Sequence, residues 1–443
     1  MEIKRTDFLK TAIGATVGVA AVATASPWYS EAEAAIGNFP AGTTGPSIFV
    51  GLCTPFTGSY SSDGEDQHKG FVLAVEDLNK GTGVMAKIPS LAGKKGLLGK
   101  KIVYRVADSE TKPSVAIQRA TEFITQNKAI LIVGGLASSS DIALEKLAQQ
   151  QKVLYMMGPS GSNDTTGIDC QRYDFRSQPD GYMVAHALDP YLIEEYGKNR
   201  KCIFLLPDYS YGHSMADSLS EDLKERGGWT TVAKVVAPFP TSDYSSYLTN
   251  IANSDAEVFL NIEYGIDGVA STKQAVQFGI AKKMKLVIPN ISSYLPDGLG
   301  PDIMQGNLGV SDWYWGFADR FPLSKIFLDS FIKRFPGVYP RWTAHVAYSQ
   351  LAMWADAVAH AKTFDPVAII KYLEEGNKVN LMLGDIYYRA GDHDQVRPVP
   401  VLRGKSRSQM KNKEDFFEIV ALVPGEQVMQ PLSDTGCKMP PYT

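Results

Sequence analysis

Small hydroxyl-bearing residues follow the most apolar run of the chain. The run Ala129-Ile130-Leu131-Ile132-Val133 leads directly into the turn Gly134-Gly135-Leu136-Ala137-Ser138-Ser139-Ser140-Asp141. Where a parallel strand ends and a helix begins, free backbone N–H groups and the positive end of the helix dipole face the same space. Glycines let a ligand approach that backbone, and serine hydroxyls can donate to a carboxylate or carbonyl oxygen. The alternative is a helix cap made by serine and aspartate, without any ligand.

Three further turns place polar and aromatic side chains where strands are expected to end. Pro159-Ser160-Gly161-Ser162 follows the next apolar run, and Tyr209-Ser210-Tyr211-Gly212 and Glu263-Tyr264-Gly265 follow two runs of the second half. Tyrosine rings at such positions can cover an apolar ligand while their hydroxyls form hydrogen bonds. Core or surface tyrosines are the alternative for each residue taken alone. The grouping of these turns, rather than any one of them, predicts a binding site.

Motifs for covalent or metal chemistry are incomplete. Gly158-Pro159-Ser160-Gly161-Ser162 lacks the final glycine of a nucleophile elbow, and the lysine-rich segment 93–101 lacks the spacing and hydroxyl residue of a phosphate loop. The six histidines are scattered without His-x-x-x-His spacing. The sequence therefore predicts a binding protein that is not an enzyme and has neither metal nor cofactor.

Apolar, strand-like runs alternate with amphipathic segments through most of the chain. Strands are expected at 47–53, 101–107, 129–134 and 153–156, and again at 201–206, 230–236, 258–262 and 285–288. Such a βαβ rhythm is typical of a parallel sheet covered by helices. We therefore expect an α/β fold with two doubly wound parallel-sheet lobes joined by crossing hinge strands.

The two lobes are expected to be discontinuous in sequence. Crossing strands are predicted near Phe175-Gln178, Val310-Trp313 and Arg389-Gln395. These crossings assign 45–175 plus 312–390 to the N-terminal lobe, and 176–311 plus 391–443 to the C-terminal lobe and tail. The lobes would close by hinge motion on one ligand.

The first 34 residues predict an export signal. Lys4, Arg5 and Lys10 precede an uncharged run from Thr11 to Ala25, and Ala32-Glu33-Ala34 offers a cleavage site. The run is too short to span a membrane as a helix, although a membrane anchor is the alternative interpretation. With 44 basic and 48 acidic residues and no large basic cluster, the chain does not indicate nucleic-acid binding. We expect a periplasmic protein whose signal peptide, 1–34, is removed.

Four cysteines accompany this export signal, and no Cys-x-x-Cys motif occurs among them. Cys53 and Cys202 lie in apolar strand-like runs, where a buried thiol is expected. Cys170 and Cys437 lie in polar, loop-like contexts, so these two are the candidates for a disulfide. The bridge would tie the C-terminal tail to the body.

The chain resembles the periplasmic leucine/isoleucine/valine-binding protein family, the type I solute receptors of ABC importers, over nearly its whole mature length. The motifs that support this are Thr54-Pro55-Phe56-Thr57-Gly58 with Gly64, Leu98-Gly99-Lys100-Lys101-Ile102, Asp108, the turn from Leu136 to Ser140, Tyr211-Gly212, and Tyr264. The resemblance implies that Ser138 and Ser162 hold the carboxylate of a substrate, and that Tyr211 and Tyr264 close over it from the other lobe.

Two positions depart from the family pattern. The glutamate that meets the substrate ammonium aligns with Asn290, and a pocket tyrosine aligns with Asp63. Either Asp63 replaces the lost carboxylate and amino-acid binding is preserved, or the ligand is an amide, a urea-like compound or an organic acid without an ammonium. The complete set of expected ligand-binding residues is Asp63, Leu136, Ser138, Ser139, Ser162, Tyr211, Tyr264 and Asn290.

The resemblance also implies partners. It predicts a monomer that captures a small polar solute and delivers it to an inner-membrane ABC permease with its ATPase. A periplasmic ligand sensor for a membrane receptor has the same fold, and no residue distinguishes the two functions.

Overall fold

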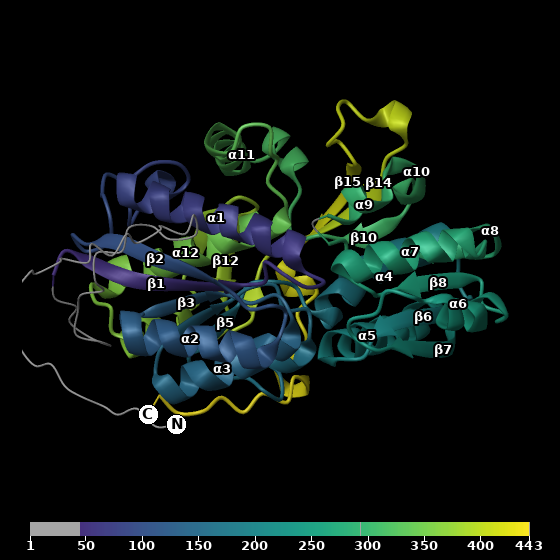
Figure 1. The fold of residues 1–443 in the computed structure, drawn as a ribbon, viewed down its shortest axis with the longest axis horizontal. Coiled ribbons are helices and arrows are strands. Elements are labelled where there is room, and N and C mark those ends of the chain that lie inside the picture. The colour runs from purple at the N-terminus through teal and green to yellow at the C-terminus, as the bar shows by residue number, and fades with distance from the viewer. Residues whose placement is uncertain (1–44, 293, 443) are drawn as a thin grey trace, which may run out of the picture.

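The first lobe is built on a parallel sheet of five strands (Figure 1). The computed structural model describes residues 45–292 and 294–442, so the expected signal peptide lies outside the described residues. The sheet has the order β2-β1-β3-β4-β5. Its strands are β1 (Ser47–Thr54), β2 (Lys101–Asp108), β3 (Leu131–Gly134), β4 (Leu154–Met157) and β5 (Asp174–Arg176). Every residue of β1, β3 and β4 is buried, as expected for a parallel sheet with helices on both faces.

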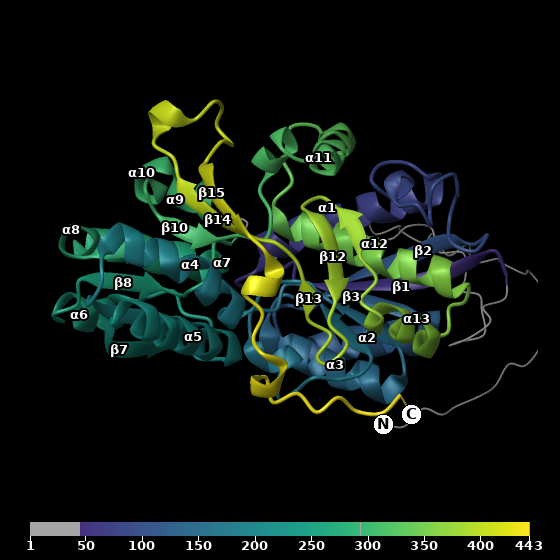
Figure 2. The ribbon, with the colours of Figure 1, turned by 180° about the vertical axis from the view of Figure 1, so that it is seen from behind.

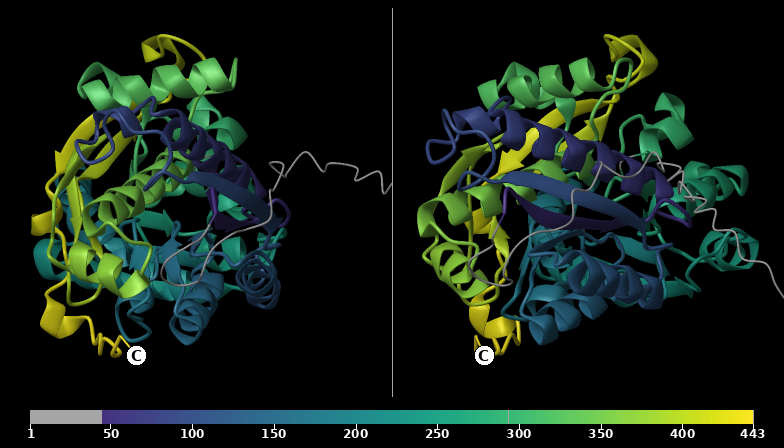
Figure 3. Two further views of the ribbon diagram at one scale, coloured as in Figure 1. Left: turned by 90° about the vertical axis from the view of Figure 1, so that its left-hand side faces the viewer. Right: turned by 60° about the vertical axis from the view of Figure 1, so that its left-hand side comes forward.

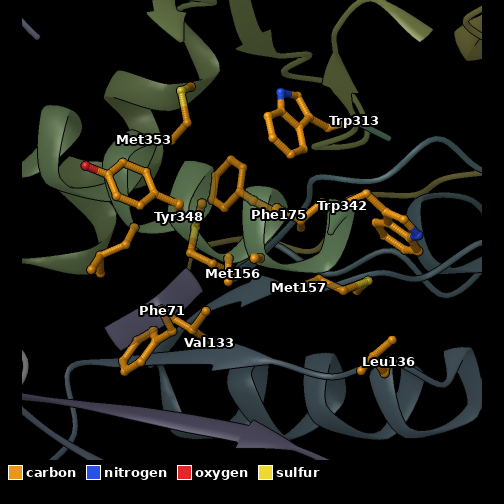
Figure 4. Packing of buried hydrophobic residues seen from close by; sticks show 14 of the residues in the cluster. Phe71, Val133, Leu136, Met156, Met157, Phe175, Trp313, Trp342, Tyr348 and Met353 are labelled. Carbon is orange, nitrogen blue, oxygen red and sulfur yellow. The ribbon is translucent and has the colours of Figure 1, made fainter. Parts of the chain in front are cut away.

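Helices cover both faces of this sheet. In Figure 1, α1 and α12 lie above the strands, and α2 and α3 lie below them. The helices of the first lobe are α1 (Ser61–Lys80), α2 (Pro113–Asn127), α3 (Ser138–Gln151), α11 (Pro322–Arg334), α12 (Trp342–Ala361) and α13 (Pro366–Glu374). Phe71, Met156, Phe175 and Tyr348 pack between the sheet and α12, as Figure 4 shows. The first core is therefore formed by segments from both ends of the chain.

The second lobe repeats this plan on a smaller scale. Its parallel sheet has the order β7-β6-β8-β9. The strands are β6 (Lys201–Pro207), β7 (Thr230–Ala237), β8 (Val258–Asn261) and β9 (Lys285–Val287). The helices are α4 (Gly181–Tyr196), α5 (Ser210–Gly227), α6 (Ser245–Ala252), α7 (Gly265–Gln277), α8 (Ile280–Lys283), α9 (Leu295–Leu299) and α10 (Pro301–Met304). The expected α/β fold with two parallel-sheet lobes is thus confirmed.

Two small antiparallel sheets complete the lobes (Figure 2). On the second lobe, β14 (Val399–Gly404) lies between β10 (Leu308–Val310) and β15 (Phe417–Val423). On the first lobe, β12 (Gly384–Tyr388) lies between β11 (Val379–Leu381) and β13 (Gln395–Val396). The side views of Figure 3 show the late, yellow part of the chain running along one flank of the molecule.

The chain passes between the lobes at three places. It crosses after β5, after β10, and between β13 and β14. The third crossing falls after the predicted stretch Arg389-Gln395, because β13 still pairs with β12 of the first lobe. The expected boundary between 390 and 391 therefore lies a few residues before the crossing. The proposed lobes are 45–175 plus 312–396 and 176–311 plus 397–443, with the end of the tail lying against the first lobe.

A disulfide between Cys170 and Cys437 fixes the C-terminal tail to the first lobe, with the two Cα atoms 5.7 Å apart. Beside it, the Arg172 Nε–H donates to the Pro440 carbonyl at 2.8 Å, and the Tyr173 hydroxyl donates to the Tyr442 carbonyl at 2.6 Å. The side chains of Cys53 and Cys202 are buried thiols. The tail that the sequence grouped with the second lobe therefore ends on the first.

Candidate functional site

A small cavity lies between the two lobes. Both lobes and one crossing segment supply its lining. The lining residues among those described are Leu136, Ser138, Pro159, Gly161, Gln178, Tyr209, Tyr211, Tyr264, Asn290 and Trp342. Most of them follow the carboxyl end of a parallel strand, which is where ligands bind in open α/β sheets.

The first wall of the cavity comes from the turns after β3 and β4. Gly134 adopts a positive φ of 120°, and a Cβ atom there would lie 2.1 Å from the Cys53 carbonyl oxygen, so the turn requires glycine. Helix α3 then begins at Ser138, whose side chain is buried at the cavity. After β4, Pro159 and Gly161 continue the same wall.

The start of α3 has no side-chain cap. The residue that precedes the helix, Ala137, has no side-chain acceptor, and the Asp141 carboxylate instead accepts the Tyr155 hydroxyl at 2.7 Å. The N–H groups of Ser140 and Asp141 donate to the Ala137 carbonyl, which leaves those of Ser138 and Ser139 without an acceptor inside the helix. The alternative that serine and aspartate only cap this helix is therefore wrong.

The second wall is aromatic. Tyr209 and Tyr211 follow β6, Tyr264 follows β8, and Asn290 follows β9. The rings of Tyr211 and Tyr264 lie 6.0 Å apart at an interplanar angle of 74°, and the Asn290 Nδ2–H donates to the Tyr211 hydroxyl at 3.4 Å. Burial raises the pKa of the Tyr211 hydroxyl, so it remains a neutral hydrogen-bonding group.

Gln178 and Trp342 close the cavity at its hinge side. Gln178 lies on the crossing segment after β5, and Trp342 is the first residue of α12. The Gln178 side chain is only 4% exposed, and its Oε1 has no hydrogen-bond partner among the described residues. The Trp342 ring packs 6.4 Å from the Tyr264 ring, and Figure 4 shows Trp342 and Leu136 toward the same end of the first core.

The lobes are closed around this cavity. The Tyr60 and Tyr209 hydroxyls are 2.5 Å apart, and the Tyr264 hydroxyl donates to the Asp63 carboxylate at 3.2 Å. On the same interface, the Ile266 N–H donates to the Ser59 carbonyl at 3.0 Å. Each bond joins one lobe to the other, so each would break when the lobes separate.

Five of the eight predicted ligand-binding residues meet at the cavity. Leu136, Ser138, Tyr211, Tyr264 and Asn290 all line it. All five follow the carboxyl end of a strand. That position identified four of them in the sequence, and Asn290 was expected from the family resemblance.

The other three predicted residues lie outside the lining. The Ser162 hydroxyl lies 3.1 Å from the Ser214 hydroxyl of the second lobe, so it joins the lobes directly. The Asp63 carboxylate accepts the Tyr264 hydroxyl from behind the aromatic wall. Ser139, one residue beyond Ser138 on α3, is partly exposed and does not reach the cavity.

Sequence reasoning missed two lining residues altogether, Gln178 and Trp342. Both reach the cavity through the path of the chain between the lobes, and no local motif surrounds either of them. Tyr209, Pro159 and Gly161 belong to turns that the sequence did single out. A Cβ atom at Gly161 would lie 2.7 Å from the Tyr211 ring, so this glycine permits the close approach of the second lobe.

The cavity lining carries no formal charge. Among the described lining residues there is no lysine, arginine, histidine, aspartate or glutamate. Glu263 immediately precedes Tyr264 but is buried beside the cavity, and burial raises the pKa of its carboxyl to about 8. Recognition here depends on hydroxyls, amides, backbone N–H groups and aromatic rings.

The described residues contain no cluster of histidine, cysteine, aspartate or glutamate suited to holding a metal ion. In the same part of the chain, no helix has the length and apolar character to cross a membrane.

Two α/β lobes that close over a small internal cavity define a solute-binding protein with the type I periplasmic binding fold. A family model described as periplasmic binding protein matches residues 47–409, and the chain belongs to this family.

Several known proteins are similar to this chain in sequence or in fold. Leu/Ile/Val-binding protein homolog 8 from Brucella suis is 27% identical over 305 residues, which cover 66% of this chain and 68% of the relative. The crystal structure of a periplasmic binding protein from Burkholderia mallei is 25% identical with a TM-score of 0.79, covering 88% of this chain and 98% of that one. A solute-binding protein of an ABC transporter from R. palustris, in complex with benzoate, is 19% identical with a TM-score of 0.71, covering 88% and 99%.

Proposed function

We propose that this protein is the substrate-binding component of an ABC importer. It captures one small polar solute between its lobes and presents the closed form to a membrane permease, whose ATPase is a separate chain. The observation that carries the proposal is the uncharged cavity that both lobes and a crossing segment build together. A site divided in this way is complete only when the lobes close, so ligand binding and closure stabilise each other.

The proposed location is the periplasm, after removal of residues 1–34. The basic start and apolar run of this segment support export, and the disulfide between Cys170 and Cys437 suits an oxidising compartment. The protein would act as a monomer and would perform no covalent chemistry. Among the described residues that line the cavity, none is a histidine, lysine, aspartate or glutamate that could serve the hydroxyls as a catalytic base.

The proposed solute is an amino acid, an amide, a urea-like compound or a small organic acid. The cavity is small, which favours a small solute. Its apolar part would contact Leu136, Pro159 and the aromatic wall, while Ser138 and the start of α3 would hold a carbonyl or carboxylate oxygen.

Thermal unfolding of the mature chain tests the proposal. The protein is first stripped of retained solute by denaturation and refolding, and is then heated with members of each solute class. A true ligand at about 100 times its Kd adds about 2.7 kcal/mol of stability, which raises Tm by several degrees. The proposal requires at least one class to produce this shift, and fails if none does at millimolar concentration.

A further inference from the structure

We infer that the captured solute is a small carboxylate without an ammonium group. This inference rests on the proposed function and narrows its solute class. It follows from which groups line the cavity and which groups are held behind its walls.

No acidic side chain lines the cavity to pair with an ammonium. A buried ammonium is costly without a charged partner, and the described lining offers only hydroxyls, amides and rings. The sequence left Asp63 as the candidate replacement for the missing glutamate. In the structure the Asp63 carboxylate instead accepts the Tyr264 hydroxyl at 3.2 Å, and Asp63 is not among the described residues that line the cavity.

The second nearby carboxyl does not serve an ammonium either. Glu263 is buried and is not among the lining residues, so it does not contact a solute in the cavity directly. Neither Asp63 nor Glu263 lines the cavity, so neither offers an α-amino group a direct ion pair there.

The aromatic wall is a poor cage for a cation. An aromatic cage binds an ammonium with several ring faces directed at it. Here the Tyr264 ring meets the Tyr211 ring at 74° and the Trp342 ring at 73°, so in each pair one ring covers a face of the other with its edge. These rings are packed against each other and suit an apolar ligand body better than a cation.

A carboxylate, in contrast, finds complementary groups. The buried Ser138 hydroxyl lies at the uncapped start of α3, a helix of 14 residues, where backbone N–H groups and the helix dipole favour an anion. The buried Gln178 amide lines the same cavity, and its Oε1 has no partner among the described residues. Because the two ends of an amide are assigned from their partners, Gln178 can turn its NH₂ group toward a bound carboxylate. Asn290 provides a second amide from the opposite lobe.

Matched pairs of solutes test the inference by isothermal titration of stripped protein. 4-Methylpentanoate is leucine without its ammonium, and phenylacetate is phenylglycine without its ammonium. We expect each deaminated acid to bind at least tenfold more tightly than its amino acid. The neutral 4-methylpentanamide should bind more weakly than 4-methylpentanoate, because the helix start favours the anion.

The outcomes that contradict the inference distinguish an error in the solute class from an error in the proposed function. Leucine or phenylglycine binding as tightly as its partner would overturn the inference while leaving the proposed function intact. Glycine betaine binding more tightly than the acids would show a cation cage, with the same consequence. If the amide binds best, the carboxylate assignment is wrong. If no solute of any class binds, the proposed function itself fails.

Asn290→Asp provides a second, independent test. The new carboxylate would face the cavity, so it should repel 4-methylpentanoate and favour leucine, shifting the ratio of the two affinities at least tenfold toward leucine. Asn253→Asp makes the same change of charge at an exposed position outside the cavity and should leave the ratio unchanged. If both variants keep the wild-type ratio, the ligand does not occupy this cavity as inferred.

Discussion

Tyr264→Phe should weaken solute binding by opening the lobes. The substitution removes one hydroxyl, whose hydrogen bond to Asp63 joins the second lobe to the first at 3.2 Å. An intramolecular hydrogen bond contributes about 0.5 to 1.5 kcal/mol net. In the open form water can replace this bond, so its loss acts on the closed form. Since each 1.4 kcal/mol is about tenfold in affinity, we expect solute affinity to fall by about 2-fold to 12-fold.

Because Tyr264 also lines the cavity, a double-mutant cycle must separate closure from direct contact with the solute. Asp63→Ala removes the acceptor from behind the wall, and the double variant removes both groups. If the interlobe hydrogen bond accounts for the loss of solute affinity, the double variant should bind the solute no more weakly than the single variant with the lower affinity. Titration calorimetry measures each affinity.

Tyr247→Phe is the matched control, since Tyr247 lies on α6 away from the cavity. It should bind the solute as the wild type does. Additive losses in the double-mutant cycle, or an unchanged affinity of Tyr264→Phe, would refute the reasoning that this bond stabilises the closed form.

Three further predictions concern anion binding, pH and the tail. Ser138→Ala should weaken binding of a carboxylate solute by about tenfold in calorimetry, for the loss of a hydrogen bond of about 1.5 kcal/mol, whereas Ser114→Ala in the exposed first turn of α2 should not. The pKa of Glu263 is raised to about 8, so the folded chain retains a proton that the unfolded chain releases. The free energy of unfolding should therefore fall as pH rises from about 4.5 to 8, by up to about 1.4 kcal/mol per pH unit. Denaturant titrations measure this free energy, and Glu263→Gln should remove the contribution of Glu263 to the fall. Reduction of the bridge between Cys170 and Cys437 should lower the free energy of unfolding by about 2 to 5 kcal/mol, and an unchanged Tm under reductant would contradict this.

Much of the fold could be predicted because buried parallel strands form uninterrupted apolar runs. The run before Gly134 becomes β3, and the expected strand at 101–107 becomes β2 (Lys101–Asp108). A short strand was harder to predict, because β5 (Asp174–Arg176) has only three residues and shows no periodicity of its own. It was predicted as a crossing segment, yet it pairs with β4 as the last strand of the first sheet.

The candidate site could be predicted where it follows from strand ends, and not where it depends on closure. Ser138 and Tyr264 lie directly after strands, so the topology alone brings them to one edge. Gln178 and Trp342 are brought to the cavity by a crossing segment and a late helix. The Ser162 hydroxyl is directed to Ser214 by the approach of the second lobe, a contact that no local pattern records.

The distance between the lobes, measured with and without solute, shows whether the protein captures its solute by closing. Spin labels can be attached at Lys112→Cys and Ser242→Cys, two exposed positions on opposite lobes, while Cys53 and Cys202 are buried. We expect pulsed electron paramagnetic resonance to show longer or mixed distances in stripped protein. A saturating solute should shift these to a single shorter distance. If a solute binds with the expected stoichiometry and the distances do not change, capture by closure of the two lobes is contradicted.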